Sequence, residues 1–283
     1  MGFLRNADKR FQQQNLHEKE LVPKLKSNSS PTVIPGLNLK FINSPEIADQ
    51  VRNDEPEGEL KMTERKNLTI SKIAIYLIIF FSIWSIRELA VQPILLDPLN
   101  IIVSEIIGAI IKLLVWTLPA LLLIKYFQDD MWISLKDMFT TKPKWFKGAP
   151  IMLVIIIAPL LQALLHGGGI AVRPDFVPIR LIGVVLFVGI TEEIVFRGFL
   201  LNAFLKKMKM WQAVALDAVL FYLIHIPIWI YQGHDIAFFL SATISVTVLS
   251  VLFAYSFIKT KNILVPIALH MIWNLLAFTL YLG

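Results

Sequence analysis

Residues 236–258 decide the fold: they read IAFFLSATISVTVLSVLFAYSFI and contain no charged side chain. An α-helix rises about 1.5 Å per residue, so this stretch would form a helix of roughly 35 Å. The hydrocarbon core of a bilayer is about 30 Å thick, and a helix needs ~20 apolar residues to cross it. Asp235 and Lys259 bound the stretch on its two sides. The stretch therefore predicts a transmembrane helix.

Six further apolar segments have the same character. They lie at residues 73–96, 101–124, 149–165, 181–201, 211–231 and 263–282. Over the 283 residues, 56% are hydrophobic and 17% are charged, whereas soluble proteins carry roughly 25% charged residues. Apolar blocks separated by short charged stretches are typical of membrane proteins. The sequence therefore predicts an all-α fold, a polytopic membrane helical bundle of about seven transmembrane helices over residues 71–283.

Residues 1–70 differ in composition from the rest of the chain. They are polar, and prolines interrupt them at positions 23, 31, 35, 45 and 56. A segment with few apolar residues cannot bury enough surface to offset the entropy lost on folding. We interpret residues 1–70 as a disordered or weakly helical cytoplasmic tail, with a partner-binding arm as the alternative.

The chain has a net charge of +6, and many of its cations lie in loops beside the apolar segments. Lysines and arginines precede the first segment and recur in every second loop, at 61–72, 125–147, 206–209 and 259–261. Loops rich in Lys and Arg tend to stay in the cytoplasm. This alternation predicts a cytoplasmic N-terminus. It also assigns the basic residues to membrane topology, so we expect a lipid bilayer and no nucleic acid as partner.

Two adjacent carboxylates lie in the middle of the fourth segment along the chain, 181–201. The sequence around them, at 191–197, reads TEEIVFR. Charged side chains are costly inside a membrane, so they mark ion pairs or functional sites. Glu193 and Arg197 are four residues apart, share a helix face and can pair. Glu192 is rotated by about 100° from Glu193. The spacing predicts that Glu193 is structural and that Glu192 is free to act as a general base.

Two other segments carry polar residues near their middle. The fifth contains FYLIH, which ends at His225, and Pro227 follows. A proline removes a helical hydrogen bond and can open the helix around His225. The last segment along the chain, 263–282, contains HMIWN. This places His270 and Asn274 four residues apart on one side of a helix. A single His in a membrane helix is often only an interhelical hydrogen-bonding residue, but polar groups on three helices together favour a site.

These polar groups suit hydrolysis. A carboxylate and an imidazole can hold and deprotonate a water molecule, and a second imidazole with an amide can stabilise an oxyanion. Glu192, His225 and His270 could instead ligate zinc and leave one position for water. The spacing leaves both alternatives open. The chain has no cysteine, which excludes a thiol nucleophile and zinc sites built on thiolates.

Five other charged residues in the apolar segments are interpreted as structural. Arg87 and Glu88 would mark an interface or a helix end. Glu105 and Lys112 are seven residues apart, so they would face the bundle together. Asp217 would cap, pair or line a cavity.

The three groups of polar residues resemble the motifs of the CAAX protease and bacteriocin-processing family, also called CPBP or Abi. The resemblance covers residues 180–280. Each motif is weak alone, but all three occur in order, each inside an apolar helix. The motifs are Glu192-Glu193-x-x-x-Arg197, Phe221-x-x-x-His225 and His270-x-x-x-Asn274.

The resemblance implies an intramembrane endopeptidase that cleaves membrane-associated peptides or protein tails. Glu192 matches the carboxylate that activates water, assisted by His225. Glu193 and Arg197 would support Glu192, and the two polar residues of the third motif would hold the water or the oxyanion. The family is often called metalloprotease, yet a glutamate-dependent mechanism has been argued for some members. Zinc therefore stays an open alternative.

Two functions other than proteolysis would also explain polar residues inside the membrane. One is a non-catalytic membrane scaffold or bacteriocin-immunity protein, since relatives without catalysis exist, although every motif residue is present here. The other is a transporter or proton relay, because intramembrane Glu and His also serve that role; no internal repeat of the kind such proteins show is visible. The resemblance favours an integral, multi-pass protein of a bacterial cell membrane.

Overall fold

The computed structural model describes residues 67–279, with gaps at 144–145, 147–148 and 167–175. Nearly all of the tail predicted for residues 1–70 therefore lies outside the described residues. The described part of the chain is helical and contains no strand. Its main elements are α3 (Ile70–Ile86), η2 (Arg87–Leu96), α4 (Ile101–Lys112), η3 (Leu113–Thr117), α5 (Leu118–Tyr126), η4 (Gln128–Asp130), α6 (Leu135–Thr140), α7 (Ala149–His166), η6 (Leu181–Phe187), α8 (Val188–Glu193), η7 (Ile194–Leu201), α9 (Asn202–Lys207), α10 (Met210–Leu223), α11 (Ile226–Tyr231), α12 (Ile236–Thr260) and α13 (Leu264–Thr279).

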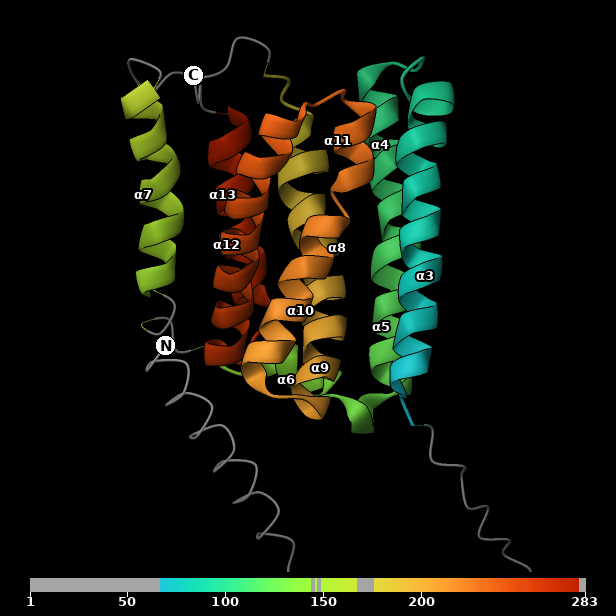
Figure 1. The fold of residues 1–283 in the computed structure, drawn as a ribbon, viewed down its shortest axis with the longest axis vertical. Coiled ribbons are helices and arrows are strands. Elements are labelled where there is room, and N and C mark those ends of the chain that lie inside the picture. The colour runs from blue at the N-terminus through green and yellow to red at the C-terminus, as the bar shows by residue number, and fades with distance from the viewer. Residues whose placement is uncertain (1–66, 144–145, 147–148, 167–175, 280–283) are drawn as a thin grey trace, which may run out of the picture. The chain divides into compact units, whose positions relative to one another are not determined.

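The described part of each predicted apolar segment is mainly helical (Figure 1), with a break at 224–225 in the fifth. Two shorter apolar helices are Pro150–Leu161 and Leu264–Phe278. The all-α, polytopic membrane bundle predicted from the sequence is confirmed. Within the described residues, four helices are long and apolar enough to cross a membrane: Ile70–Leu96, Ile101–Tyr126, Met210–Tyr231 and Ile236–Thr260.

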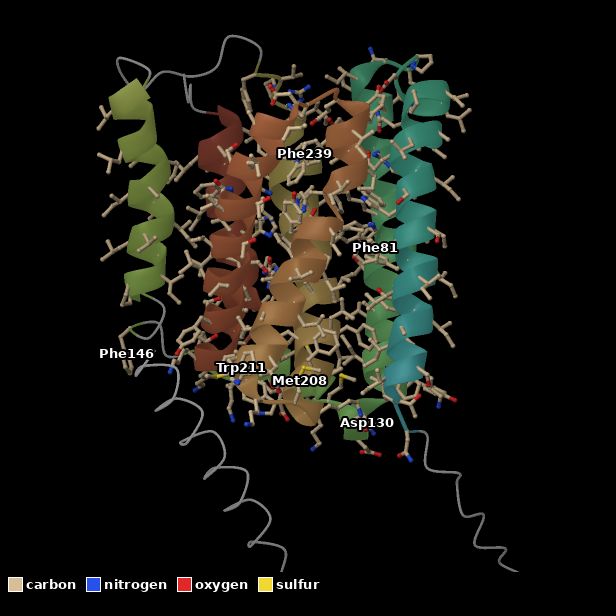
Figure 2. All side chains as sticks on the ribbon, viewed as in Figure 1. Phe81, Asp130, Phe146, Met208, Trp211 and Phe239 are labelled. Carbon is tan, nitrogen blue, oxygen red and sulfur yellow. The ribbon has the colours of Figure 1, made fainter. Side chains whose placement is uncertain are left out.

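Large apolar side chains stay exposed along the outer helices. Ile78 on α3 is 67% exposed and Ile244 on α12 is 69% exposed. In a bilayer such side chains contact lipid tails that are as apolar as they are. Figure 2 shows charged side chains at the ends of the helices, where Lys207 donates a hydrogen bond of 3.0 Å to Asp130. This distribution of side chains is that of an integral, multi-pass membrane protein.

The helix that runs from η6 to α9 lies at the centre of the bundle. Every residue from Thr191 to Leu205 is buried, and this stretch packs against α5, α10, α12 and α13. Trp116 on η3 lies edge-on to Phe80 at 4.8 Å and to Phe196 at 6.1 Å between ring centroids. Such aromatic pairs each contribute about 0.5–1.5 kcal/mol beyond their burial. This packing keeps the charges of the central helix away from lipid.

Gly189 lets α13 approach α8 closely. A Cβ atom at this position would lie 2.7 Å from Met271 Cγ and 3.4 Å from the Met271 backbone nitrogen. The distance to Cγ is shorter than real Cβ contacts, whereas the distance to the backbone nitrogen is at the lower limit of ordinary contact. Because His270 precedes Met271, the close approach also sets how near His270 comes to the carboxylates that follow Gly189 on α8.

We expect Gly189→Ala to destabilise the protein by about 1–3 kcal/mol, because the added methyl group overpacks the interface with Met271. The matched control is Gly198→Ala, whose Cβ would lie 3.7 Å from its nearest neighbours, on Ile124 and Met138, and which gains up to about 1 kcal/mol in helix propensity. Thermal unfolding of both variants in detergent measures the difference. Equal melting temperatures would show that the two helices do not depend on this approach.

Candidate active site

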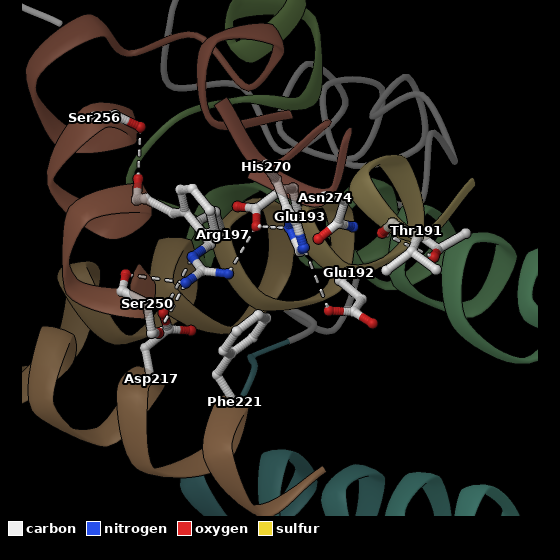
Figure 3. A network of polar contacts seen from close by, with 12 residues as sticks. Thr191, Glu192, Glu193, Arg197, Asp217, Phe221, Ser250, Ser256, His270 and Asn274 are labelled. Atoms are coloured by element: carbon white, nitrogen blue, oxygen red, sulfur yellow. Dashed lines mark hydrogen bonds and ion pairs between the residues drawn. The ribbon is translucent and has the colours of Figure 1, made fainter. Parts of the chain in front are cut away.

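Glu193 joins the central helix to α13 through one carboxylate oxygen. Its side chain is fully buried, and Oε1 accepts a hydrogen bond of 2.9 Å from Arg197 Nη1. The same Oε1 lies 2.8 Å from Nδ1 of His270 on α13. Figure 3 shows this chain of contacts. The pairing of Glu193 with Arg197 is the one that their spacing predicted, and it extends to a histidine 77 positions further along the chain.

Arg197 contacts two other helices, one through hydrogen bonds and one through an ion pair. Its Nη2 donates to the backbone oxygen of Ser250 at 3.0 Å and to Ser250 Oγ at 2.8 Å, both on α12. Its Nε lies 3.4 Å from Asp217 Oδ2 on α10, and the Phe221 ring faces the guanidinium at 4.5 Å. A buried charge is tolerated when it is paired and hydrogen-bonded in this way. Arg197 thus ties η7 to α10, α12 and, through Glu193, to α13.

Glu192 points its carboxylate to a different side from Glu193. Its Oε2 lies 3.9 Å from Nε2 of His225 and 3.9 Å from Nε2 of His270. Within the described residues this buried oxygen has no hydrogen-bond partner. A separation of 3.9 Å exceeds a direct hydrogen bond and suits a bridging water. The other oxygen, Oε1, lies 3.8 Å from Lys112 Nζ.

His225 lies at a break in the fifth predicted helix. α10 ends at Leu223 and α11 begins at Ile226, with Pro227 in its first turn. His225 Nδ1 is 2.7 Å from the backbone oxygen of Phe221; because a carbonyl only accepts, Nδ1 must donate. Nε2 is therefore the nitrogen presented to Glu192. The helix opens around His225, as Pro227 predicted. Nε2 of His225 lies as close to Glu192 Oε2 as Nε2 of His270 does, at 3.9 Å.

His270 and Asn274 reach the site from α13. His270 Nδ1 donates to Glu193, so its Nε2 faces Glu192, and its ring stacks on Phe253 at 4.8 Å. Asn274 Nδ2 donates to the backbone oxygen of Val184 at 3.1 Å. All of the predicted site residues are thus brought into one region of the bundle.

A cleft of about 720 Å³ exposes part of this region. Glu192, His225, His270 and Asn274 line it. Glu193 and Arg197 lie behind the cleft wall, fully buried. The geometry therefore separates the carboxylate that a ligand could reach from the carboxylate that holds the helices together.

The sequence did not place several further residues in the site. Lys112, interpreted as structural, lines the cleft next to Glu192. Asp217, also interpreted as structural, lies beside Arg197. Ser250 was not singled out, because a serine in an apolar helix is too common to indicate a buried ion network. No spacing rule relates residues of different helices, so these contacts are visible only in three dimensions.

The distances between Glu192, His225 and His270 bear on the alternative that these three residues bind zinc. A tetrahedral zinc bound at about 2.0–2.1 Å brings its ligand atoms to roughly 3.3–3.4 Å of one another. The Glu192 oxygen is 3.9 Å from each histidine nitrogen. Among the described residues, no group of three His, Asp or Glu side chains is arranged to hold a metal ion. The three side chains thus lie further apart than zinc ligands would, and zinc stays an open alternative.

Residues 174–276 match the family model of the type II CAAX prenyl endopeptidases described as Rce1-like. The match includes all three motifs and confirms the resemblance to the CAAX protease and bacteriocin-processing family. It supports a CAAX-type intramembrane protease. No curated protein and no solved structure matches the chain.

We expect Arg197→Met to destabilise this CAAX-protease-like bundle by about 3–5 kcal/mol, because it leaves the buried carboxylates of Glu193 and Asp217 without a cation. Adding Asp217→Asn to this variant should recover part of the loss, since it removes one of the two uncompensated charges. Chemical denaturation in detergent, followed by circular dichroism, measures both variants. A single variant as stable as the wild type would contradict the structural role of the network.

Proposed function

We propose that this protein is an intramembrane endopeptidase in which Glu192 is the general base. The observation that carries the proposal is the position of Glu192 Oε2, a buried acceptor in the cleft that lies 3.9 Å from Nε2 of both histidines. In the proposed mechanism one water molecule lies here, between the carboxylate and the two imidazoles. Such a water is placed for deprotonation and attack on a carbonyl carbon.

The reaction follows from the donors and acceptors around that water. Glu192, assisted by His225, accepts a proton from the water. At the same time the water oxygen attacks the scissile carbonyl carbon. The carbonyl oxygen becomes an oxyanion, and the C–N bond then breaks as the proton held by Glu192 passes to the leaving amine. Every atom of the water ends in the products: hydroxyl on the new carboxyl group, hydrogen on the new amine.

The third motif supplies contacts for the oxyanion. Glu193 fixes the ring of His270 by accepting a hydrogen bond from its Nδ1 at 2.8 Å, and Nε2 of His270 faces the reacting groups. Asn274 uses one N–H of its amide on the Val184 oxygen, and its second N–H is available to the substrate. Donors fixed in a site that excludes water stabilise developing charge strongly. Arg197 contributes indirectly, because it holds Glu193 in place at 2.9 Å.

The substrate class follows from the membrane and from the family match. The cleft lies between apolar helices, so a substrate must reach it from the bilayer or its surface. The family described as CAAX prenyl endopeptidase favours lipid-modified protein tails, and membrane-associated peptides are the broader class. We place the protein in a bacterial cell membrane with a cytoplasmic N-terminus, on the loop charges and the family resemblance.

We expect Glu192→Gln to lower cleavage by at least about 10²-fold, because the amide cannot accept the proton of the water. His225→Ala should have an effect of the same order. Asp129→Asn, which changes an exposed carboxylate at the end of the bundle, is the matched control and should keep full activity. The assay follows products from purified membranes by mass spectrometry, together with an internally quenched prenylated CAAX peptide. Identical products from wild type and Glu192→Gln would favour the non-catalytic scaffold or immunity protein.

The role of a metal is tested separately. Because the distances fit a water site and the mechanism assigns deprotonation to Glu192, we expect cleavage to survive dialysis against 1,10-phenanthroline. The zinc content of the purified protein should also stay well below one atom per chain. Loss of activity on dialysis, with recovery on adding zinc, would instead make Glu192, His225 and His270 the metal ligands.

A further inference from the structure

Lys112 lies in the cleft on the opposite side of the Glu192 carboxylate from the two histidines. Its Nζ is 3.8 Å from Glu192 Oε1, while Oε2 of the same carboxylate faces His225 and His270. Lys112 ends α4, on a helix that carries none of the three motifs. The two oxygens of Glu192 are thus divided between a cation on one wall and imidazoles on the other.

The ammonium group of Lys112 is held in place by aromatic rings. Nζ lies 5.2 Å from the centroid of the Trp84 ring and 5.5 Å from that of Trp116. A cation over an aromatic face gains about 0.5–2 kcal/mol, most where water is excluded. Trp84 and Trp116 are themselves buried, at 3% and 1% exposed. A flexible lysine is therefore confined to one position, which is an arrangement that a merely solvated lysine would not need.

In the described part of the chain, the other Arg and Glu side chains that line the cleft are not paired with Glu192. Arg87 is engaged with Glu88, with Nη1 at 2.7 Å from Oε2. Arg180 and Glu105 also line the cleft, but in the described part of the chain neither is paired with Glu192. Lys112 is the cation whose ion pair with Glu192 the geometry supports.

We propose that Lys112 is a positioning residue for the reaction: it holds Glu192 Oε1 so that Oε2 points at the water between the histidines. The proposal rests on the proposed peptidase function and adds to it a residue outside the family motifs. A carboxylate free to rotate would present its base to the water only part of the time. Misplacement of a catalytic group by about 1 Å can cost 10²-fold in rate.

The test compares three variants with the internally quenched prenylated CAAX peptide in proteoliposomes. Lys112→Met keeps an unbranched side chain between the tryptophan rings but removes the cation. We expect it to lower kcat by about 10–100-fold and to leave KM and the melting temperature close to wild type. Lys112→Arg, which restores a cation, should recover most of the loss. Lys125→Met removes an exposed lysine from the end of the same helix and should behave as wild type.

The outcomes separate this proposal from the function it rests on. If wild type cleaves, Glu192→Gln does not, and Lys112→Met cleaves as wild type, the positioning role is overturned while the peptidase function stands. Equal losses in Lys112→Met and Lys112→Arg, with lowered melting temperatures, would also overturn it, because the side chain would then be needed only for packing. If wild type shows no cleavage that depends on Glu192, the peptidase function fails, and the role of Lys112 fails with it.

Discussion

The pairing of Arg197 with Glu193 inside the bundle is the interaction on which the other contacts of the site depend. Neither side chain is exposed, and they meet at 2.9 Å. A charge placed in a membrane protein is tolerated when it faces the interior and is paired. The guanidinium of Arg197 reaches two further helices: Nη2 donates hydrogen bonds to Ser250 on α12, and the charge pairs with Asp217 on α10. Satisfying one buried guanidinium thus sets the positions of several helices relative to each other.

The same network prepares the chemistry. Glu193 Oε1 is shared between Arg197 and His270 Nδ1, so the structural ion pair also determines which nitrogen of His270 faces the cleft. His225 reaches the same state by another route, because the Phe221 carbonyl takes its Nδ1 proton. In both histidines an acceptor binds Nδ1: the Phe221 carbonyl for His225 and the Glu193 carboxylate for His270. Nε2 of each ring therefore faces Glu192. Structural and chemical roles are divided between two adjacent glutamates, which a helix turns about 100° apart.

Two local features of the helices make this geometry reachable. Gly189 removes the side chain that would keep α13 away from α8. The break between α10 and α11 moves His225 out of a regular helix and toward Glu192. Gly189 lies outside the polar motifs, whereas the break includes His225 of the second motif. Both features act on the distances between the motifs. Lys112 adds a third contribution from α4, where aromatic rings confine its ammonium group near Glu192.

Sequence alone determined the helical membrane fold, the pairing of Glu193 with Arg197 and the opening of the helix at His225. These are local properties: an apolar stretch, a spacing of four and a proline each act within one helix. The convergence of the three motifs was suggested by their placement at mid-span and by family resemblance. The tertiary structure alone decided that Asp217 and Ser250 complete the Arg197 network and that Lys112 faces Glu192. Contacts between helices depend on how each helix is rotated and how closely it packs, and no periodicity along one chain encodes the distance between two of them.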